Sequence, residues 1–193
     1  MTRIISGTAR GRSIRVPASG TRPTADRARE GLFSSLQVRF GFHDAVVLDL
    51  FAGSGALGLE AASRGAAEVT LVDSSRRAVE VIRSNAGVVG HPAVRVVETK
   101  ASTFVASAPR GHFSMVLADP PYDLDDEAVN DMVTALVPLL VEGAVVVVER
   151  HSSSPEVAWP EGFRRTTQKL KKRTYGIARF DMAVWDPDGV GEA

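Results

Sequence analysis

The chain has no cysteine among its 193 residues, which excludes disulfide bonds and thiolate metal ligands. Histidine is scarce as well. The four histidines are scattered, and none has a second histidine at the spacing of a helical metal site. They are His43, His91, His112 and His151. We therefore expect no metal site.

Long apolar runs are also lacking. A membrane-spanning helix needs roughly 18 or more apolar residues, whereas the run around Ala144–Val148 is only long enough for a strand. The segment Met1–Gly7 has no apolar stretch followed by a small-residue cleavage site, so we expect no secretory signal. With 44% hydrophobic and 24% charged residues, the composition is typical of a globular protein. We expect a cytoplasmic monomer that does not enter a membrane.

Net charge is zero, but the charges are unevenly distributed. Residues 1–40 carry eight basic and two acidic side chains, residues 41–160 carry eight and sixteen, and residues 164–179 carry seven basic and no acidic ones. A single basic run is a solvent-exposed surface without a partner about as often as it is a binding surface. Two such runs in one small domain favour a polyanionic partner. The side chains expected to contact its phosphates are Arg3, Arg10, Arg12, Arg22, Arg27, Lys169, Lys171, Lys172 and Arg173.

Strand and helix patterns alternate through most of the chain. The apolar periodicity predicts strands over 46–50, 69–72, 94–97, 113–118 and 144–149, and helices over 24–37, 55–64, 75–86, 101–108 and 125–140. Hairpins are predicted at 3–16 and at 164–185. This order indicates an α/β fold whose mostly parallel sheet is buried on both faces and binds its ligand at the carboxyl ends of the strands. We expect a basic hairpin over 1–23, a main domain over 24–185 and a flexible tail over 186–193.

A glycine-rich turn follows the first strand of this series. Gly53, Gly55 and Gly58 fit a GxGxxG pattern, which lets the backbone approach a nucleotide, and Asp73 ends the next strand, where it can accept ribose hydroxyls. This half of the site fits NAD or S-adenosylmethionine. Asp49 favours the latter, because it could meet an ammonium group and would repel a pyrophosphate. The predicted cofactor-binding residues of this half are Asp49, Phe51, Ala52, Gly53, Ser54, Gly55, Asp73 and Ser74.

The sequence Asp119-Pro120-Pro121-Tyr122 ends the fourth strand. Proline also simply ends strands, but this combination suits the methylation of an exocyclic base amine. Asp119 and the Pro120 carbonyl can each accept one N–H of the amine, Pro121 stiffens the backbone, and Tyr122 offers a ring on which a flipped base can stack. We predict that these four residues are catalytic and that Asp119 also borders the cofactor. The motif leaves guanine N2 and adenine N6 as alternatives.

These motifs together resemble the RsmD-type 16S ribosomal RNA guanine-N2 methyltransferases over nearly the whole chain. The matching stretches are 3–7 with 10–12, 22–24 with 26–30, 49–60 and 119–122. The resemblance implies a Rossmann-like class I methyltransferase fold with a seven-stranded sheet whose last strand is antiparallel. It also implies S-adenosylmethionine as cofactor and one guanine of 16S ribosomal RNA, in the assembled or assembling small subunit, as target.

Two positions depart from the family pattern. Asp73 ends the second strand where the family often has glutamate, and its shorter side chain can still serve. Lys100 follows the third strand where a small polar residue is common, so the contact to the cofactor adenine is expected from Ala101 or Ser102. Three other hypotheses stay open: an adenine-N6 methyltransferase, a ribosome-assembly factor that binds RNA without catalysis, and an NAD-dependent oxidoreductase. The last lacks an evident proton relay near a strand end.

Overall fold

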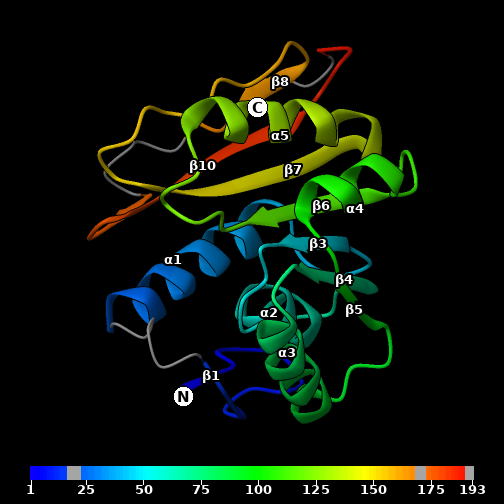
Figure 1. Ribbon diagram of the computed structural model, residues 1–193, viewed down its shortest axis with the longest axis vertical. Coiled ribbons are helices and arrows are strands. Elements are labelled where there is room, and N and C mark those ends of the chain that lie inside the picture. The colour runs from blue at the N-terminus through cyan, green and yellow to red at the C-terminus, as the bar shows by residue number, and fades with distance from the viewer. Residues whose placement is uncertain (17–22, 168–172, 190–193) are drawn as a thin grey trace.

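A twisted, mostly parallel β-sheet runs through the molecule with helices on both of its faces (Figure 1). The computed structural model describes residues 1–16, 23–167 and 173–189. The described strands of the sheet are β3 (Val46–Leu50), β4 (Glu68–Asp73), β5 (Val94–Glu98), β6 (Phe113–Ala118), β7 (Leu140–His151), β8 (Phe163–Arg165), β9 (Thr174–Tyr175) and β10 (Ala178–Trp185).

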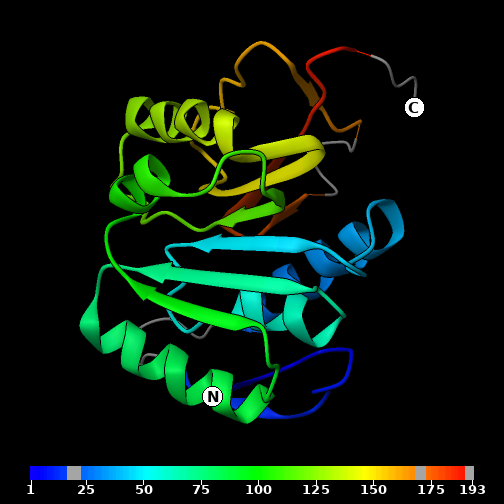
Figure 2. The same cartoon turned by 90° about the vertical axis from the view of Figure 1, so that its right-hand side faces the viewer.

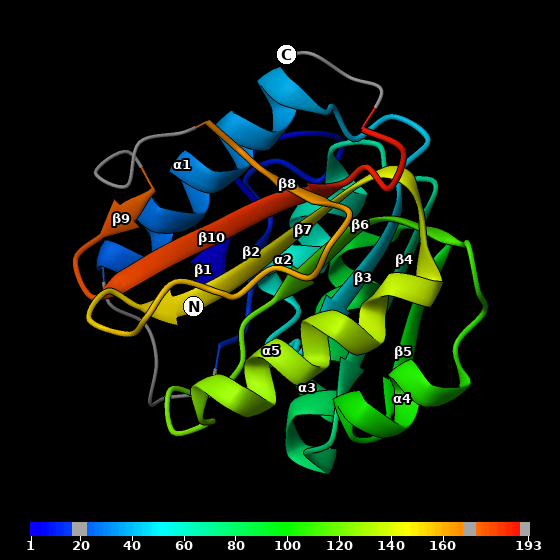
Figure 3. The same ribbon diagram turned by 90° about the horizontal axis from the view of Figure 1, so that it is seen from above.

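The strand order β5-β4-β3-β6-β7-β10-β8 places the first strand of the alternating series in the middle of the sheet. Strands β3 to β7 pair in parallel, and Figure 2 shows β3, β4 and β5 running in the same direction. The long β10 is antiparallel to β7 and lies between it and β8 (Figure 3). The predicted seven strands with an antiparallel last strand are confirmed, and the two-residue β9 pairs with β10 in addition.

Two apolar cores lie on opposite faces of the sheet. Helices α1 (Pro23–Arg39), α2 (Ala56–Ser63) and α3 (Arg76–Val89) pack on one face around Phe33, Leu59 and Ile82. Helices α4 (Ala101–Ser107) and α5 (Asp126–Leu136) pack on the other around Phe104 and Val133. The strands between them are apolar on both faces because each face is buried. Within the described residues, no helix has the length and apolar character that a membrane span requires.

The segment after α5 corrects the sequence prediction. A helix was expected over 125–140, but α5 ends at Leu136 and a short 3-10 helix follows over Val137–Leu139. Pro138 cannot donate a backbone hydrogen bond inside an α-helix, and its ring clashes with the preceding turn. The chain therefore enters β7 at Leu140, four residues before the predicted start of that strand.

The N-terminal hairpin consists of β1 (Thr2–Arg3) and β2 (Ser13–Ile14) and packs against α2. The buried Glu60 carboxylate accepts hydrogen bonds from the backbone N–H groups of Ile5 at 2.7 Å and Ser6 at 3.1 Å. Gly7 lies so close to α2 that a Cβ there would stand 1.7 Å from the Ser63 carbonyl oxygen. The hairpin is therefore fixed to the helix that follows the glycine-rich turn.

The buried Asn85 side chain of α3 joins the end of the hairpin to that turn. Its Oδ1 accepts from the Arg15 N–H, and its Nδ2 donates to the carbonyl oxygens of Arg15 and Ser54, each at 2.8 Å. Residues 15 and 54 are therefore held by one amide group.

Candidate active site

Four acidic side chains lie at the carboxyl ends of adjacent strands. Asp49 is in β3, Asp73 ends β4, Asp119 directly follows β6, and Glu149 is near the end of β7. Parallel pairing aligns these ends at one edge of the sheet, as the sequence predicted for the first three. The pair Ala118 and Val148 is in register, so Asp119 and Glu149 are the next residues on neighbouring strands.

The turn between β3 and α2 is built from left-handed residues. Gly53 has a φ of 57° and Gly55, which precedes the first turn of α2, has a φ of 77°. Phe51 also has a positive φ, of 60°. A residue with a side chain pays about 1–2 kcal/mol for this conformation, and such strain is common at ligand sites.

Asp73 fixes this turn from the neighbouring strand. One carboxylate oxygen accepts the Gly53 N–H and the other accepts the Ser75 N–H, each at 2.8 Å. A carboxylate has about four lone-pair positions, so both oxygens retain capacity for a ligand hydroxyl. The side chain lines a cavity, as a ribose-binding residue must.

Asp49 is fully buried behind the turn. Its Oδ2 accepts the Gly58 N–H at 2.8 Å, while its Oδ1 is buried without a hydrogen-bond partner among the described residues. Burial raises the pKa of Asp49 to about 7; the Gly58 hydrogen bond opposes this shift and the charge of Asp73 adds to it. The predicted contact of Asp49 with a ligand ammonium would need this carboxylate to become accessible.

A cavity of about 910 Å³ opens between the ends of the strands and helices α4 and α5. Five of the predicted cofactor-binding residues line it: Phe51, Asp73, Ser74, Ala101 and Ser102. Apolar side chains from α4 and α5, including Val105 and Met132, complete its walls. A cavity of this size, with apolar walls and the Asp73 carboxylate at the strand ends, suits a nucleoside.

The remaining predicted cofactor residues lie behind or beside this cavity. Ala52 and Gly55 are buried, and Gly53 and Ser54 are half-buried. At Gly53 the position of a Cβ is open, since the nearest neighbour is the Phe51 carbonyl oxygen at 3.9 Å. A ligand can therefore approach the backbone there, which fits a bound nucleoside cofactor.

The Asp119-Pro120-Pro121-Tyr122 segment leaves the sheet at its middle. The Asp119 N–H donates to the Leu50 carbonyl at 3.3 Å, and the Leu124 N–H donates to the Pro121 carbonyl at 2.9 Å, closing a turn before α5. Pro120 is buried, whereas Asp119 and Tyr122 are exposed. An acidic group and an aromatic ring are thus presented together beside the glycine-rich turn.

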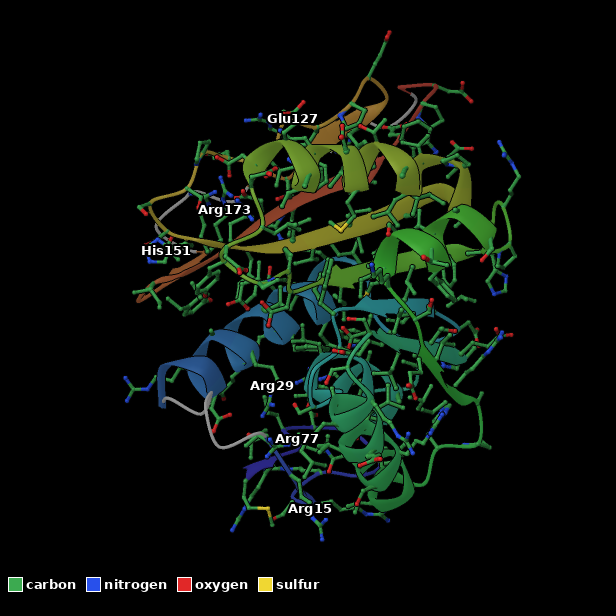
Figure 4. All side chains as sticks on the ribbon, in the orientation of Figure 1. Arg15, Arg29, Arg77, Glu127, His151 and Arg173 are labelled. Atoms are coloured by element: carbon green, nitrogen blue, oxygen red, sulfur yellow. The ribbon has the colours of Figure 1, made fainter. Side chains whose placement is uncertain are left out.

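Glu149 is a site residue that the sequence did not predict. Its Oε1 accepts a hydrogen bond from the Tyr122 hydroxyl at 2.9 Å. The His151 ring, at the end of β7 in Figure 4, meets the Tyr122 ring edge-on with 5.5 Å between centroids. In the sequence, the only sign of its role is that an acidic residue ends the most apolar strand. The strand order is needed to show that Glu149 lies beside Asp119.

The carboxylates affect one another's protonation. The pKa of Asp119 is raised well above its usual value by desolvation, and further by the charges of Glu149 and Asp49. Asp119 itself keeps an exposed surface. Burial also raises the pKa of Glu149, against the effect of the hydrogen bond from Tyr122. Together they form a site with affinity for N–H donors or positive charge.

The predicted phosphate-binding arginines near the N-terminus are in different situations. Arg3, Arg10 and Arg27 are exposed. Arg12 donates from one guanidinium nitrogen to the Val88 and Val89 carbonyls at the end of α3. Arg29, which is not among the predicted contacts, lies near the hairpin in Figure 4 and is buried against Thr2, Arg3 and Asp26.

In the basic region over 164–179, Arg173 is held by ion pairs within the protein. Its guanidinium pairs with Asp181 and with Glu156, and its side chain is only 12% exposed. Four further predicted contacts, Arg22, Lys169, Lys171 and Lys172, lie outside the described residues. Among the described residues, no group of three His, Cys, Asp or Glu side chains could hold a metal ion.

The sequence matches one protein family through almost its whole length. The family described as "Conserved hypothetical protein 95" matches residues 2–183. "Ribosomal RNA small subunit methyltransferase D" of Haemophilus influenzae is 32% identical over 192 residues, covering 93% of this chain and 92% of that protein.

A protein of the same name in Escherichia coli K12 is 44% identical over 131 residues. That alignment covers 66% of this chain and 65% of the Escherichia coli protein. The solved structure described as "Putative methyltransferase yhhF from Escherichia coli" superposes with a TM-score of 0.79 at 33% identity, covering 96% of this chain and 98% of the other.

Proposed function

Because the chain belongs to the "Conserved hypothetical protein 95" family, we propose that it is an S-adenosylmethionine-dependent methyltransferase acting on N2 of a guanine in 16S ribosomal RNA. The observation that carries this proposal is that Asp119, at the end of β6, lies next to the end of β3 and its glycine-rich turn. Phe51 from that turn and Asp73 from β4 line a cavity that fits a nucleoside. The relatives named small-subunit methyltransferase D support ribosomal RNA as the substrate. We propose that the reaction takes place in the cytoplasm.

The cofactor would occupy the cavity beside β4. Asp73 would accept the ribose hydroxyls. Phe51 and Met132 are on the apolar walls of this cavity, and the N-terminus of α4 is at one end of it. When bound, S-adenosylmethionine supplies an electrophilic methyl group on its sulfonium. A positively charged cofactor would favour the ionised form of the buried Asp49 behind the turn, whereas a pyrophosphate would oppose it.

The acceptor base would lie at Asp119. The Asp119 carboxylate and the Pro120 carbonyl each hold one N–H of the amine, which directs the nitrogen lone pair away from both acceptors. Methyl transfer to this nitrogen would leave S-adenosylhomocysteine, and the Asp119 carboxylate would take up the proton that the nitrogen loses. The raised pKa of Asp119 makes it a better proton acceptor than an ordinary aspartate, and positioning supplies much of the rate.

The basic N-terminal region would hold the RNA. Arg3, Arg10 and Arg27 are exposed and can contact phosphates, which position the nucleic acid without reading its sequence. The target guanine must leave its stack to reach Asp119, so a loop or junction in the small subunit suits the site.

The test is mass spectrometry of nucleosides from small subunits and from naked 16S RNA, each incubated with the protein and labelled S-adenosylmethionine. We expect labelled N2-methylguanosine at one position, with Asp119→Asn losing turnover while calorimetry shows that it still binds the cofactor. N6-methyladenosine as product would refute the guanine assignment. Unchanged turnover in Asp119→Asn would refute the assigned role of the carboxylate.

A further inference from the structure

Glu149 occupies the position next to Asp119 on the neighbouring strand. Leu117 and Val147, two residues earlier in each strand, both belong to the core on the α1–α3 face. Because side chains alternate along a strand, Asp119 and Glu149 project toward that same face at the same edge of the sheet. The charge of Glu149 raises the pKa of Asp119, which places the two carboxylates within electrostatic reach.

Tyr122 fixes the orientation of Glu149. Its hydroxyl donates to Oε1 at 2.9 Å, while Oε2 takes no hydrogen bond from the described residues. Glu149 itself is only partly buried. Oε2 is therefore an acceptor on a side chain that Tyr122 orients, on the strand next to Asp119, which would hold the amine.

A second acceptor beside the amine site can distinguish guanine from the other bases that carry an exocyclic amine. Guanine, adenine and cytosine all have an exocyclic amine, but only guanine has a ring N–H beside it. In adenine and cytosine the neighbouring ring nitrogen is itself an acceptor. Two adjacent carboxylates can accept the N1–H and N2–H donors of guanine. In adenine or cytosine the second carboxylate would face a ring nitrogen that is itself an acceptor, which is unfavourable.

We propose that Glu149 is a specificity-determining residue that accepts the N1–H of the target guanine while Asp119 holds the N2 amine. This inference rests on the proposed function, because it assumes a base amine at Asp119. It supplies the distinction between guanine and adenine that the Asp119-Pro120-Pro121-Tyr122 motif leaves open.

The experiment compares two substrates that share the N2 amine. The methylated guanosine is first mapped with the wild-type protein, and the RNA is then prepared with 2-aminopurine at that position. 2-Aminopurine keeps the amine but carries an acceptor at N1. We expect the wild type to have a kcat/KM about 10- to 100-fold lower on 2-aminopurine, the range for losing a hydrogen bond to a charged group.

The variant Glu149→Gln keeps the shape of the side chain, and its amide can donate to an unprotonated N1. We expect it to lose activity on guanosine and to bring the ratio of the two kcat/KM values close to one. Tyr122→Phe, which removes the hydroxyl from Oε1 but keeps the ring, should reduce the ratio partly. Calorimetry with S-adenosylhomocysteine checks that both variants retain the fold.

A Glu149→Gln variant that slows both substrates equally would overturn the proposal and leave Glu149 a structural residue. Equal use of both substrates by the wild type would overturn it as well, even if the variant did not fold. If the wild type methylates no guanosine, the proposed function itself fails, and this is seen at the mapping step before any variant is made.

Discussion

Asp49, Asp73 and Asp119 have the same side chain but different surroundings. Asp73 receives two backbone N–H groups, Asp49 receives one and is sealed from solvent, and Asp119 is exposed beside Glu149. A carboxylate is stabilised by donors and destabilised by burial and by like charge. The same residue type can therefore organise the turn, charge the region behind it, and hold a substrate.

Asp49 should make stability depend on pH near neutrality. Its folded pKa, about 7, lies above the unfolded value of 3.8, so folding favours the protonated form. The associated stability is fully present below the unfolded pKa and is lost as pH rises to about 7, by roughly 1.4 kcal/mol per unit of pKa difference. Asp49→Asn should therefore gain stability over the wild type as pH rises from 4 to 8.

Urea unfolding of both proteins across that range measures the difference. The Asn side chain can still accept the Gly58 N–H, so this contact is kept as the control. A difference in unfolding free energy that does not vary with pH would contradict the assignment.

Activity should have an acid limb governed by Asp119 and its neighbours. A carboxyl group with a raised pKa is neutral below that pKa and accepts an N–H poorly, so turnover should rise with pH through it. Glu149→Gln removes one of the charges that raise this pKa and should move the limb to lower pH, while Asp49, Tyr122 and His151 remain in place. The measurement is kcat against pH, and an unmoved limb would show that the two groups do not interact.

Among the contacts between elements, the packing of the N-terminal hairpin on α2 depends on Gly7. Gly7→Ala would place a methyl group 1.7 Å from the Ser63 carbonyl oxygen, so we expect the hairpin to be displaced from α2 and its hydrogen bonds to Glu60 to be lost. Stability should fall by more than the 1–2 kcal/mol that a left-handed alanine costs by itself.

Gly11→Ala is the matched control for that variant. Gly11 has a φ of 82°, close to the 86° of Gly7, but nothing lies within 4 Å of its Cβ position. Denaturant unfolding and RNA binding should both be affected more by Gly7→Ala. Equal losses would mean that backbone strain, and not the contact with α2, determines the effect.

The alternating elements could be predicted from the sequence because their signals are local. Both β3 and β6 begin and end at the predicted residues, and of the two serines that could cap α3, Ser74 and Ser75, the structure uses Ser75. Contacts between distant segments could not be predicted. Glu149 joins the site only because β7 lies next to β6, and Arg173 is paired with acidic side chains that no charge count along the sequence reveals.

At the scale of the whole molecule, RNA binding should weaken steeply with salt. Each phosphate contact releases condensed counterions, so replacing one exposed arginine that makes such a contact should reduce the slope of log K against log salt by about one. We expect this for Arg10→Ala and Arg27→Ala. Arg39→Ala is the control, because Arg39 is also exposed but lies at the far end of α1, before β3. Filter binding at several salt concentrations gives the slopes, and equal slopes for all three variants would argue against an N-terminal RNA surface.

Asn85 links the two ligands that the proposed reaction must bring together. One amide holds both the strand end that leaves the basic hairpin and the carbonyl of Ser54 in the cofactor turn. If bound RNA orders the end of the hairpin, it also orders the turn at Ser54. The ligand that binds first therefore bears part of the entropy cost of ordering for both. Linkage makes such an effect reciprocal: cofactor tightens RNA by the same factor as RNA tightens cofactor. A side chain that touches neither ligand would then determine how strongly the binding of one ligand favours the binding of the other.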